Sequence, residues 1–462
     1  MAHMRGGNAK LAAVIAQAGL SHAQIARVFV RVALEAGALE FTGVGRSHVS
    51  HWVGGSRPSG RAPQLLREAL SRCVGRVVTL DEIGLADELA AQHGAPNWHA
   101  DTLIGLADLG RVDVDVGRRR LLGVTAYSVA ALALPTEQWW EQMEGRGRAR
   151  SAAGARRVGR GDVEAVHDMA AAFSRIDQRR GGGHARTAVA QYLTSDVVAY
   201  LRGNFPNDRI RREMFAAASE LAYLSGWMAF DNTEHAIAQH YFTIAVKLAA
   251  EADDPPMAGH VLRAMAHQAV DLGHPHQALD LATASMEGTR YALATPRERA
   301  LFGAVHARAL AATEQKRAAT AALIRAEDDL AAAGSGDEEP SRVFFFGEAS
   351  LAHETACTLR DIGDLAHAVR QFRRSVRTRK AATFARTHAV TLGYLGAVQA
   401  RQGSIDEACA TWSRSLDAMD GIRSGRARQV AIDMRSMLSL FRARGIRAVA
   451  ELDARARSYL RE

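Results

Sequence analysis

GWMAFDNTEHAIAQHYFTIA, residues 226–245, carries the strongest structural signal in this 462-residue chain. Its small and large side chains fall at regular steps from Gly226: Ala238, Phe242 and Ala245 lie 12, 16 and 19 residues further on. The intervening DNTEHA is typical of a turn. This spacing predicts two antiparallel helices that approach closely at the small residues, with the bulky side chain beside them.

The same steps recur four more times in the C-terminal half, where the residue twelve on is always alanine and the residue nineteen on is always small. The four units comprise Ala266, Ala278, Ala282 and Ser285; Ala307, Ala319, Leu323 and Ala326; Ala356, Ala368, Phe372 and Ser375; and Gly396, Ala408, Trp412 and Ser415. We therefore expect five consecutive helix pairs, a further pair upstream across QRRGGGH (178–184), and a helical cap over 426–460.

This pattern resembles the tetratricopeptide repeat. Successive units start 40, 41, 49 and 40 residues apart, against about 34 in that family, so longer helices or loops are expected. The loop GSGDEEPS (334–341) accounts for the longest step. Apolar residues elsewhere also recur with helical periodicity, and the chain is predicted to be all-α.

Positive charge is concentrated near the N-terminus. Residues 1–80 hold ten Lys or Arg and three Glu, a balance of 10 − 3 = +7, against a formal net charge of +8 for the chain. A second basic run, GRGRARSAAGARRVGR (145–160), has six arginines and no acid. Such concentration favours a polyanionic partner, although scarce lysine and abundant alanine also fit a GC-rich genome.

Four regions are predicted along the chain: a tail or expression remnant (1–10), a DNA-binding domain (11–93), a linker (94–160) and the repeat domain with its cap (161–462). RRRLLGVTAYSVAALALP (118–135) has the form of a signal sequence, but its apolar run is 14 residues long, short of the ~20 needed to span a bilayer. We expect a buried helix there and no membrane partner. Three widely spaced cysteines favour a reducing cytoplasm.

The N-terminal region predicts a helix, a turn at Gly19, a second helix capped by Ser21, and a helix over 46–53. In that last helix Val49 and Trp52 share one face.

The residues S-x-A-Q-I-A (21–26) and S-x-V-S-x-W-x-x-G-x-R-P (47–58) resemble the helix-turn-helix of phage-repressor-like, XRE-type regulators. The resemblance implies an N-terminal helix-turn-helix domain in which Val49 and Trp52 are core residues and short polar side chains enter the major groove. About 13 extra residues separate the two halves, and 36–45 is expected to lengthen the second helix or form a wing. The expected DNA-binding residues are Gln24, then Arg46, Ser47, His48, Ser50 and His51 for the base edges, and Arg57 and Arg61 for phosphates.

The concave wall of the repeat array is the expected ligand site. Positions beside the small residue of each first helix should face inward, and their side chains suit a peptide or an anionic small molecule. They are Tyr223, Trp227, Arg263, His267, Arg308 and His353. Solvated or intramolecular contacts are the alternative role for these groups.

No catalytic motif is found: HExxH, the Walker loop, GxSxG and paired cysteine ligands are all missing from the sequence. We therefore expect no enzyme activity, catalytic residue, metal or cofactor. The whole layout resembles actinobacterial regulators with an XRE-like domain and a tetratricopeptide-like array, similar to Gram-positive peptide-sensing quorum regulators. That resemblance implies a dimeric regulator of development or secondary metabolism that binds double-stranded DNA. A repeat scaffold for protein–protein interaction is the alternative.

Overall fold

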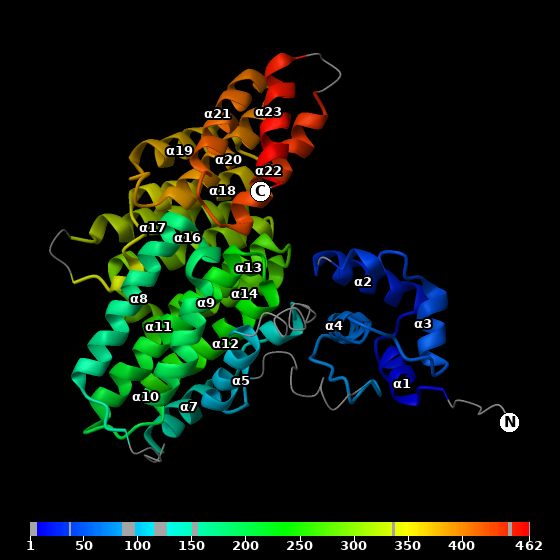
Figure 1. The fold of residues 1–462 in the computed structure, drawn as a ribbon, viewed down its shortest axis with the longest axis vertical. Helices are drawn as coiled ribbons and strands as arrows, with labels where there is room; N and C mark the ends of the chain where they lie inside the picture. Colours follow the sequence, from blue (N-terminus) through cyan, green and yellow to red (C-terminus); the bar gives the residue numbers. More distant parts are fainter. Residues whose placement is uncertain are drawn as a thin grey trace.

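The computed structural model describes residues 7–36, 38–85, 98–114, 127–149, 156–334, 338–441 and 446–461. The protein is all-helical, as predicted, with a small N-terminal domain beside a long helical array (Figure 1). Within the described part of the chain, β-type pairing is limited to an isolated bridge between Arg157 and Asn204. None of the described helices is long and apolar enough to cross a bilayer.

The N-terminal domain forms around one apolar core that runs from Leu11 to Leu85. Its helices are α1 (Ala9–Gln17), α2 (His22–Glu35), α3 (Arg46–Val53) and α4 (Ala62–Val74). The predicted turn is present, with Gly19 at φ +64° between α1 and α2, and Ser21 caps α2 together with Gln24. The expected helix over 46–53 is confirmed as α3.

The inserted stretch between α2 and α3 neither lengthens α2 nor forms a wing. Helix α2 ends at Glu35, and a single 3₁₀ turn, η1 (Leu39–Phe41), follows. Phe41 packs edge-on against Phe29 of α2, with 6.0 Å between ring centroids. The extra residues therefore fold back onto the domain core, because Phe41 has an apolar surface to cover.

The described helices of the region expected as a linker belong to the body of the array. Helices α5 (Thr102–Val114) and α7 (Glu137–Ala149) pack on α12 (His235–Ala252), and Trp98 and Trp139 contribute to the same core as the repeats. The expected buried helix lies partly outside the described residues, at 121–126. Its described remainder is largely buried or half-buried but holds only the short turn η2 (Ala130–Leu132). Of the basic run, 150–155 are likewise outside the description.

The five predicted helix pairs are confirmed. They are α11 (Asp208–Asp231) with α12; α13 (Pro255–Asp271) with α14 (Pro275–Ser285); α16 (Pro296–Ala312) with α17 (Lys316–Ala332); α18 (Glu348–Asp361) with α19 (Leu365–Thr378); and α20 (Ala385–Arg401) with α21 (Ile405–Ala418). The short α15 (Thr289–Ala292) precedes α16. Close approach explains the small residues: a Cβ added to Gly226 would lie 2.7 Å from the Phe242 ring, and one at Gly396 would lie 2.6 Å from Trp412.

Further helices flank the five pairs at both ends. Upstream lie α8 (Arg160–Arg180), α9 (Gly182–Tyr192), the π-helical turn η3 (Leu193–Val197) and α10 (Val198–Leu201); downstream lie α22 (Gly425–Ser439) and α23 (Arg447–Tyr459). The expected cap is thus a helix pair of its own, packed on α20 and α21.

The array closes on itself, which the repeat pattern did not predict. Helix α8 packs against α20, and the α8–α9 turn pairs with the segment before α22. Arg423 donates its backbone N–H to the Arg180 carbonyl at 2.8 Å, and Gly183 donates to the Arg423 carbonyl at 2.9 Å. A Cβ at Gly181 would lie 2.4 Å from that same Arg423 oxygen. The glycine run at 181–183 therefore permits contact between the two ends of the array.

Gly226→Ala should destabilise the protein by about 1–3 kcal/mol, because the added methyl overlaps a ring packed on all sides. Gly161→Ala is the control, since a Cβ at this exposed helical position meets nothing within 4 Å; it should be neutral or stabilise by up to about 1 kcal/mol. Urea unfolding of both variants measures the difference. Equal stability would contradict the close-packed interface.

Candidate functional site

Helix α3 presents a polar face on an apolar anchor. Val49 is fully buried and Trp52 nearly so, and the Trp52 ring lies 5.3 Å from that of Phe29 in α2. The remaining predicted side chains of this helix are all exposed, namely Arg46, Ser47, His48, Ser50 and His51. In Figure 1, α3 lies on the side of the domain away from the array. The structure thus places these five residues together on one accessible helix.

Two of the predicted DNA-binding residues act as helix caps. The Gln24 side-chain oxygen accepts hydrogen bonds from the backbone N–H of Ser21 at 2.9 Å and from its hydroxyl at 2.8 Å. His48 Nδ1 accepts from the Gly45 N–H at 3.2 Å, which fixes that nitrogen as the unprotonated one. These bonds leave the Gln24 amide nitrogen and His48 Nε2 as the groups available for other contacts.

Arg57 and Arg61, expected on phosphates, donate to backbone carbonyls of their own domain. Arg57 Nη2 lies 3.1 Å from the Leu85 oxygen, and Arg61 Nη2 lies 2.9 Å from the Ala36 oxygen. Arg61 thereby fastens the end of α2 to the start of α4. The structure supplies a structural use for both arginines.

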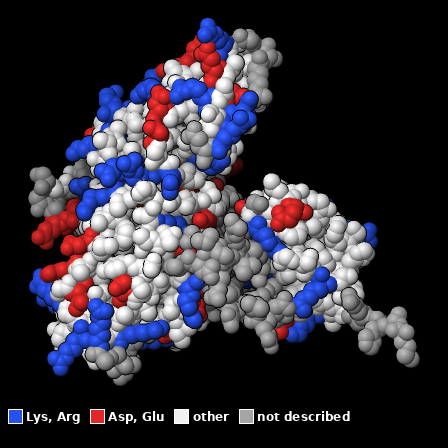
Figure 2. Space-filling view, in the orientation of Figure 1, with Lys and Arg blue, Asp and Glu red and all other residues white. Residues whose placement is uncertain are grey.

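The charge count also overstated what this domain can offer to a partner. Arg67 is buried, while Arg72 pairs with Glu35 and Glu68 at 2.7 and 2.8 Å. Arg27 and Arg31, four residues apart on α2, are exposed and make no ion pair with any described residue. Sequence reasoning missed both, although their i, i+4 spacing places them on one helix face. Figure 2 shows more basic than acidic side chains on the visible face of this domain.

A short segment joins the N-terminal domain to the array. The backbone of Ser128 exchanges two hydrogen bonds with the Gln239 side chain of α12, at 2.9 and 2.7 Å. One residue on, the Val129 N–H donates to Glu68 of α4 at 2.8 Å. Burial raises the pKa of that Glu68 carboxyl, and Arg72 opposes the shift.

The same contact continues onto the repeat array through stacked rings. Tyr127 lies parallel to His274, with 5.8 Å between ring centroids. His274 Nε2 is 3.8 Å from a Glu35 oxygen, and burial lowers the pKa of this imidazole. Since His274 precedes α14, the α13–α14 turn contacts Glu35 at the end of α2 and, through Tyr127, Arg72 of α4.

The six residues predicted on the concave wall do come together, but inside the closed array. Arg263 Nη2 donates to the Tyr223 hydroxyl at 3.1 Å, and the Trp227 and His267 rings lie 5.7 Å apart. Arg308 continues the chain to His267 Nε2 at 3.1 Å. Five of the six, including His353, are buried, and Trp227 is partly buried. Because the two ends of the array are in contact, the surface predicted to be an open concave wall lies in the interior.

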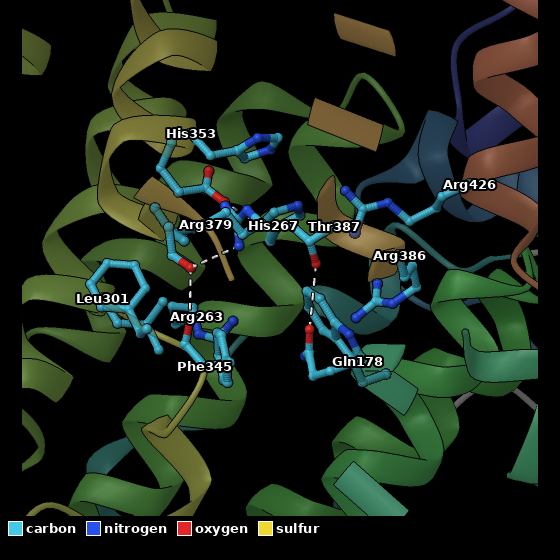
Figure 3. A pocket seen from close by; sticks show the side chains of 15 residues that line it. Gln178, Arg263, His267, Leu301, Phe345, His353, Arg379, Arg386, Thr387 and Arg426 are labelled. Atoms are coloured by element: carbon cyan, nitrogen blue, oxygen red, sulfur yellow. Dashed lines mark hydrogen bonds and ion pairs between the residues drawn. The ribbon is translucent and has the colours of Figure 1, made fainter. Parts of the chain in front are cut away.

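A cavity of about 60 Å³ lies in this interior, which is room for a few water molecules. Trp227, Arg263, His267 and His353 line it, together with residues that sequence reasoning missed. These are Gln178, Leu301, Val305, Phe345, Phe346, Ser350, Glu354, Arg379, Arg386, Thr387 and Arg426. Figure 3 shows Arg379, Arg386 and Arg426 extending from separate parts of the chain toward this space.

The lengthened repeat step has a role at this cavity. The extra residues after α17 lead into η4 (Ser341–Val343) and the aromatic run 344–346, which places Phe345 and Phe346 in the cavity wall. Glu339 accepts from the Thr295 hydroxyl at 2.5 Å, which ties the insertion to the start of α16. The insertion therefore covers one side of the cavity.

Two of the arginines around the cavity are held in ion pairs with buried or partly buried carboxylates. Arg386 is held by Asp177 at 3.0 Å and Asp231 at 2.9 Å, and all three side chains are buried. Arg308 pairs with Asp271 at 2.9 Å and Glu354 at 3.4 Å. Burial lowers the pKa of His353 to about 3 and also lowers that of His267, so both imidazoles are neutral at physiological pH.

Comparison with known proteins gives one partial match. A protein-family model described as the SP15 N-terminal domain matches residues 11–86, which coincide with the N-terminal core from Leu11 to Leu85. No curated protein matches the chain. In the described part of the chain, no group of three or more His, Cys, Asp or Glu side chains is placed to hold a metal ion.

Arg386→Met should destabilise the array by about 3–5 kcal/mol, because it leaves Asp177 and Asp231 buried without their cation. The matched control is Arg373→Met, which removes a half-exposed arginine paired with half-exposed Glu407 and should change stability little. Thermal and urea unfolding compare the two variants. An unfolding free energy for Arg386→Met close to that of the control would contradict the closure described above.

Proposed function

We propose that this protein is a DNA-binding transcription regulator whose repeat domain senses a ligand or a partner protein. The observation that carries the proposal is the polar, exposed face of α3 above buried Val49 and Trp52. Short helices anchored in this way are the usual readers of the major groove. The residues proposed for base contacts are Arg46, Ser47, Ser50 and His51, with the Nε2–H of His48 as a further donor.

Phosphate contacts in this proposal come first from Arg27 and Arg31, since both are exposed on α2, the helix on which α3 packs. Arg57 and Arg61 are secondary candidates because their guanidinium groups already bond to Leu85 and Ala36. A homodimer that binds two half-sites about one helical turn apart fits this class of regulator. The proposal includes a cytoplasmic location and control of development or secondary metabolism.

Signal transfer in this proposal passes through the α13–α14 turn. His267 on α13 lines the cavity, and His274, seven residues later, contacts Tyr127 and Glu35 at the edge of the N-terminal domain. A ligand that shifts α13 would therefore change the contacts by which α2 and α4 pack on the array. The coupling depends on a difference in affinity of the ligand for two positions of this turn.

The double substitution Ser50→Ala and His51→Ala should lower affinity for the preferred duplex by about tenfold or more, because each lost base contact costs about 1–3 kcal/mol. The full-length protein is first used to select its preferred duplex from a random pool. Fluorescence anisotropy then measures its affinity for that duplex and for an unrelated one, and the unrelated duplex should bind almost as before.

Arg27→Ala should instead weaken both duplexes alike and reduce the salt dependence of binding by about one unit of slope. Arg447→Ala, at a 91% exposed side chain on the cap, is the matched control. If the unmodified protein selects no duplex and binds none at low salt, the regulator proposal fails and the repeat scaffold becomes the better account.

His274→Ala should loosen the N-terminal domain from the array, because it removes the stack on Tyr127 without stranding a buried charge. A ring pair of this kind contributes about 0.5–1.5 kcal/mol, which corresponds to about a 2- to 10-fold larger population of the released domain. Small-angle scattering would show a larger radius of gyration. The control is His276→Ala, an exposed neighbour; the same expansion in both variants would contradict the role of the stack.

A further inference from the structure

Two arginines in the cavity wall lack a carboxylate partner. Arg263 is 1% exposed and Arg379 is 7% exposed, and neither forms an ion pair within the described part of the chain. Arg379 donates only to neutral oxygens, namely the Ala349 carbonyl at 2.9 Å and the hydroxyls of Ser375 at 3.1 Å and Ser350 at 3.5 Å. Its Nε is buried without a partner, and so is that of Arg263.

The other contacts of Arg263 are also uncharged. It donates to the Tyr223 hydroxyl at 3.1 Å and lies 2.9 Å from His260 Nε2, and burial keeps this imidazole neutral by lowering its pKa. Arg426, the third arginine, lies over the rings of Phe230 and Trp227, at 5.3 and 6.0 Å from their centroids. Burial opposes its charge, but the nearby Tyr394, Asp271 and Asp231 raise the pKa of Arg426 above its ordinary value, so this arginine is electrostatically stabilised within the protein.

Arg386 and Arg308, near the same cavity, differ from Arg263 and Arg379 in having carboxylate partners. Arg386 and Arg308 each hold two carboxylates, and Glu354, the acid in the cavity lining, is committed to Arg308. Two guanidinium groups, those of Arg263 and Arg379, therefore face the space without a carboxylate in hydrogen-bonding contact, and Arg426 adds a third positive charge beside them. Burying a cation in this way is costly, and burial accordingly lowers the pKa of Arg379 to about 10.

We propose that the cavity between Arg263, Arg379 and Arg426 binds the anionic group, a carboxylate or a phosphate, of a small effector. Guanidinium groups recognise both anions through paired, charge-assisted hydrogen bonds. The volume of about 60 Å³ suits one such group rather than a whole ligand. A second, smaller cavity of about 20 Å³ shares Gln178, Trp227 and Phe345 with the first.

Anion binding does not depend on the regulator proposal. Only the role of the bound molecule as an effector rests on that proposal. The test uses full-length protein with inorganic phosphate and, separately, acetate, each compared with chloride at equal ionic strength. Phosphate or acetate should raise the melting temperature saturably above chloride. A response to phosphate alone indicates a phosphorylated effector, and a response to acetate alone or to both indicates a carboxylate-bearing one.

Arg379→Gln should lower the affinity for whichever anion raises the melting temperature by at least about tenfold, as expected for a lost charge-assisted hydrogen bond. Its anion-free melting temperature should be no lower than that of the unmodified protein, because the substitution removes an uncompensated buried charge. A purely structural arginine would instead lower the anion-free melting temperature. Arg447→Gln should respond to the anions as the unmodified protein does, and if Arg379→Gln fails to fold, Arg426→Gln is tested for the same loss of response.

The inference is overturned if phosphate and acetate act no differently from chloride, or if Arg379→Gln responds like the unmodified protein. Duplex binding is measured on the same preparations. A protein that binds duplex but shows no anion response would overturn this inference alone, whereas a saturable anion response without duplex binding would overturn the regulator proposal alone.

Discussion

Arg386 joins the two ends of the helical array. Its guanidinium group reaches from α20 to Asp177 of α8 and Asp231 of α11, across 209 and 155 residues of sequence. The glycine run at 181–183 makes the contact possible by letting the α8–α9 turn meet the backbone at Arg423. Once the ends are joined, what would be an open concave surface becomes a closed interior.

That closure determines the chemistry of the cavity. Arginines on an open solenoid would be solvated and would need no partner. Inside the closed array the same groups are buried, and their charge must be balanced by carboxylates or by a ligand. Asp177, Asp231, Asp271 and Glu354 form ion pairs with Arg386 and Arg308. The insertion before α18 completes the enclosure by adding Phe345 and Phe346 to the wall.

Among the described residues, a small set of groups joins the N-terminal domain to the array, and these groups are connected to the cavity. Segment 127–129 is bonded to Gln239 on one side and to Glu68 on the other, while His274 connects the α13–α14 turn to Tyr127. This arrangement gives a physical basis for the proposed signal transfer.

The sequence by itself determined the all-helical fold, the five helix pairs and the buried face of α3. These depend on local spacing: Gly226 and Phe242 meet because adjacent antiparallel helices must pack at those positions, and Val49 and Trp52 share a face because they are three residues apart. It also selected four of the residues that line the cavity, since helical periodicity gives the inward side of each first helix.

Only the tertiary structure decided that the array closes, which arginines gain carboxylates, and that α5 and α7 belong to the body of the array. The partners involved lie far apart in sequence, as Arg386 and Asp177 do, and no local pattern specifies such a pairing. The same holds for Arg57 and Arg61, whose carbonyl acceptors were set by how loops fold over the domain core. Short-range periodicity identifies faces of helices, whereas the balance of buried charge depends on the complete packing.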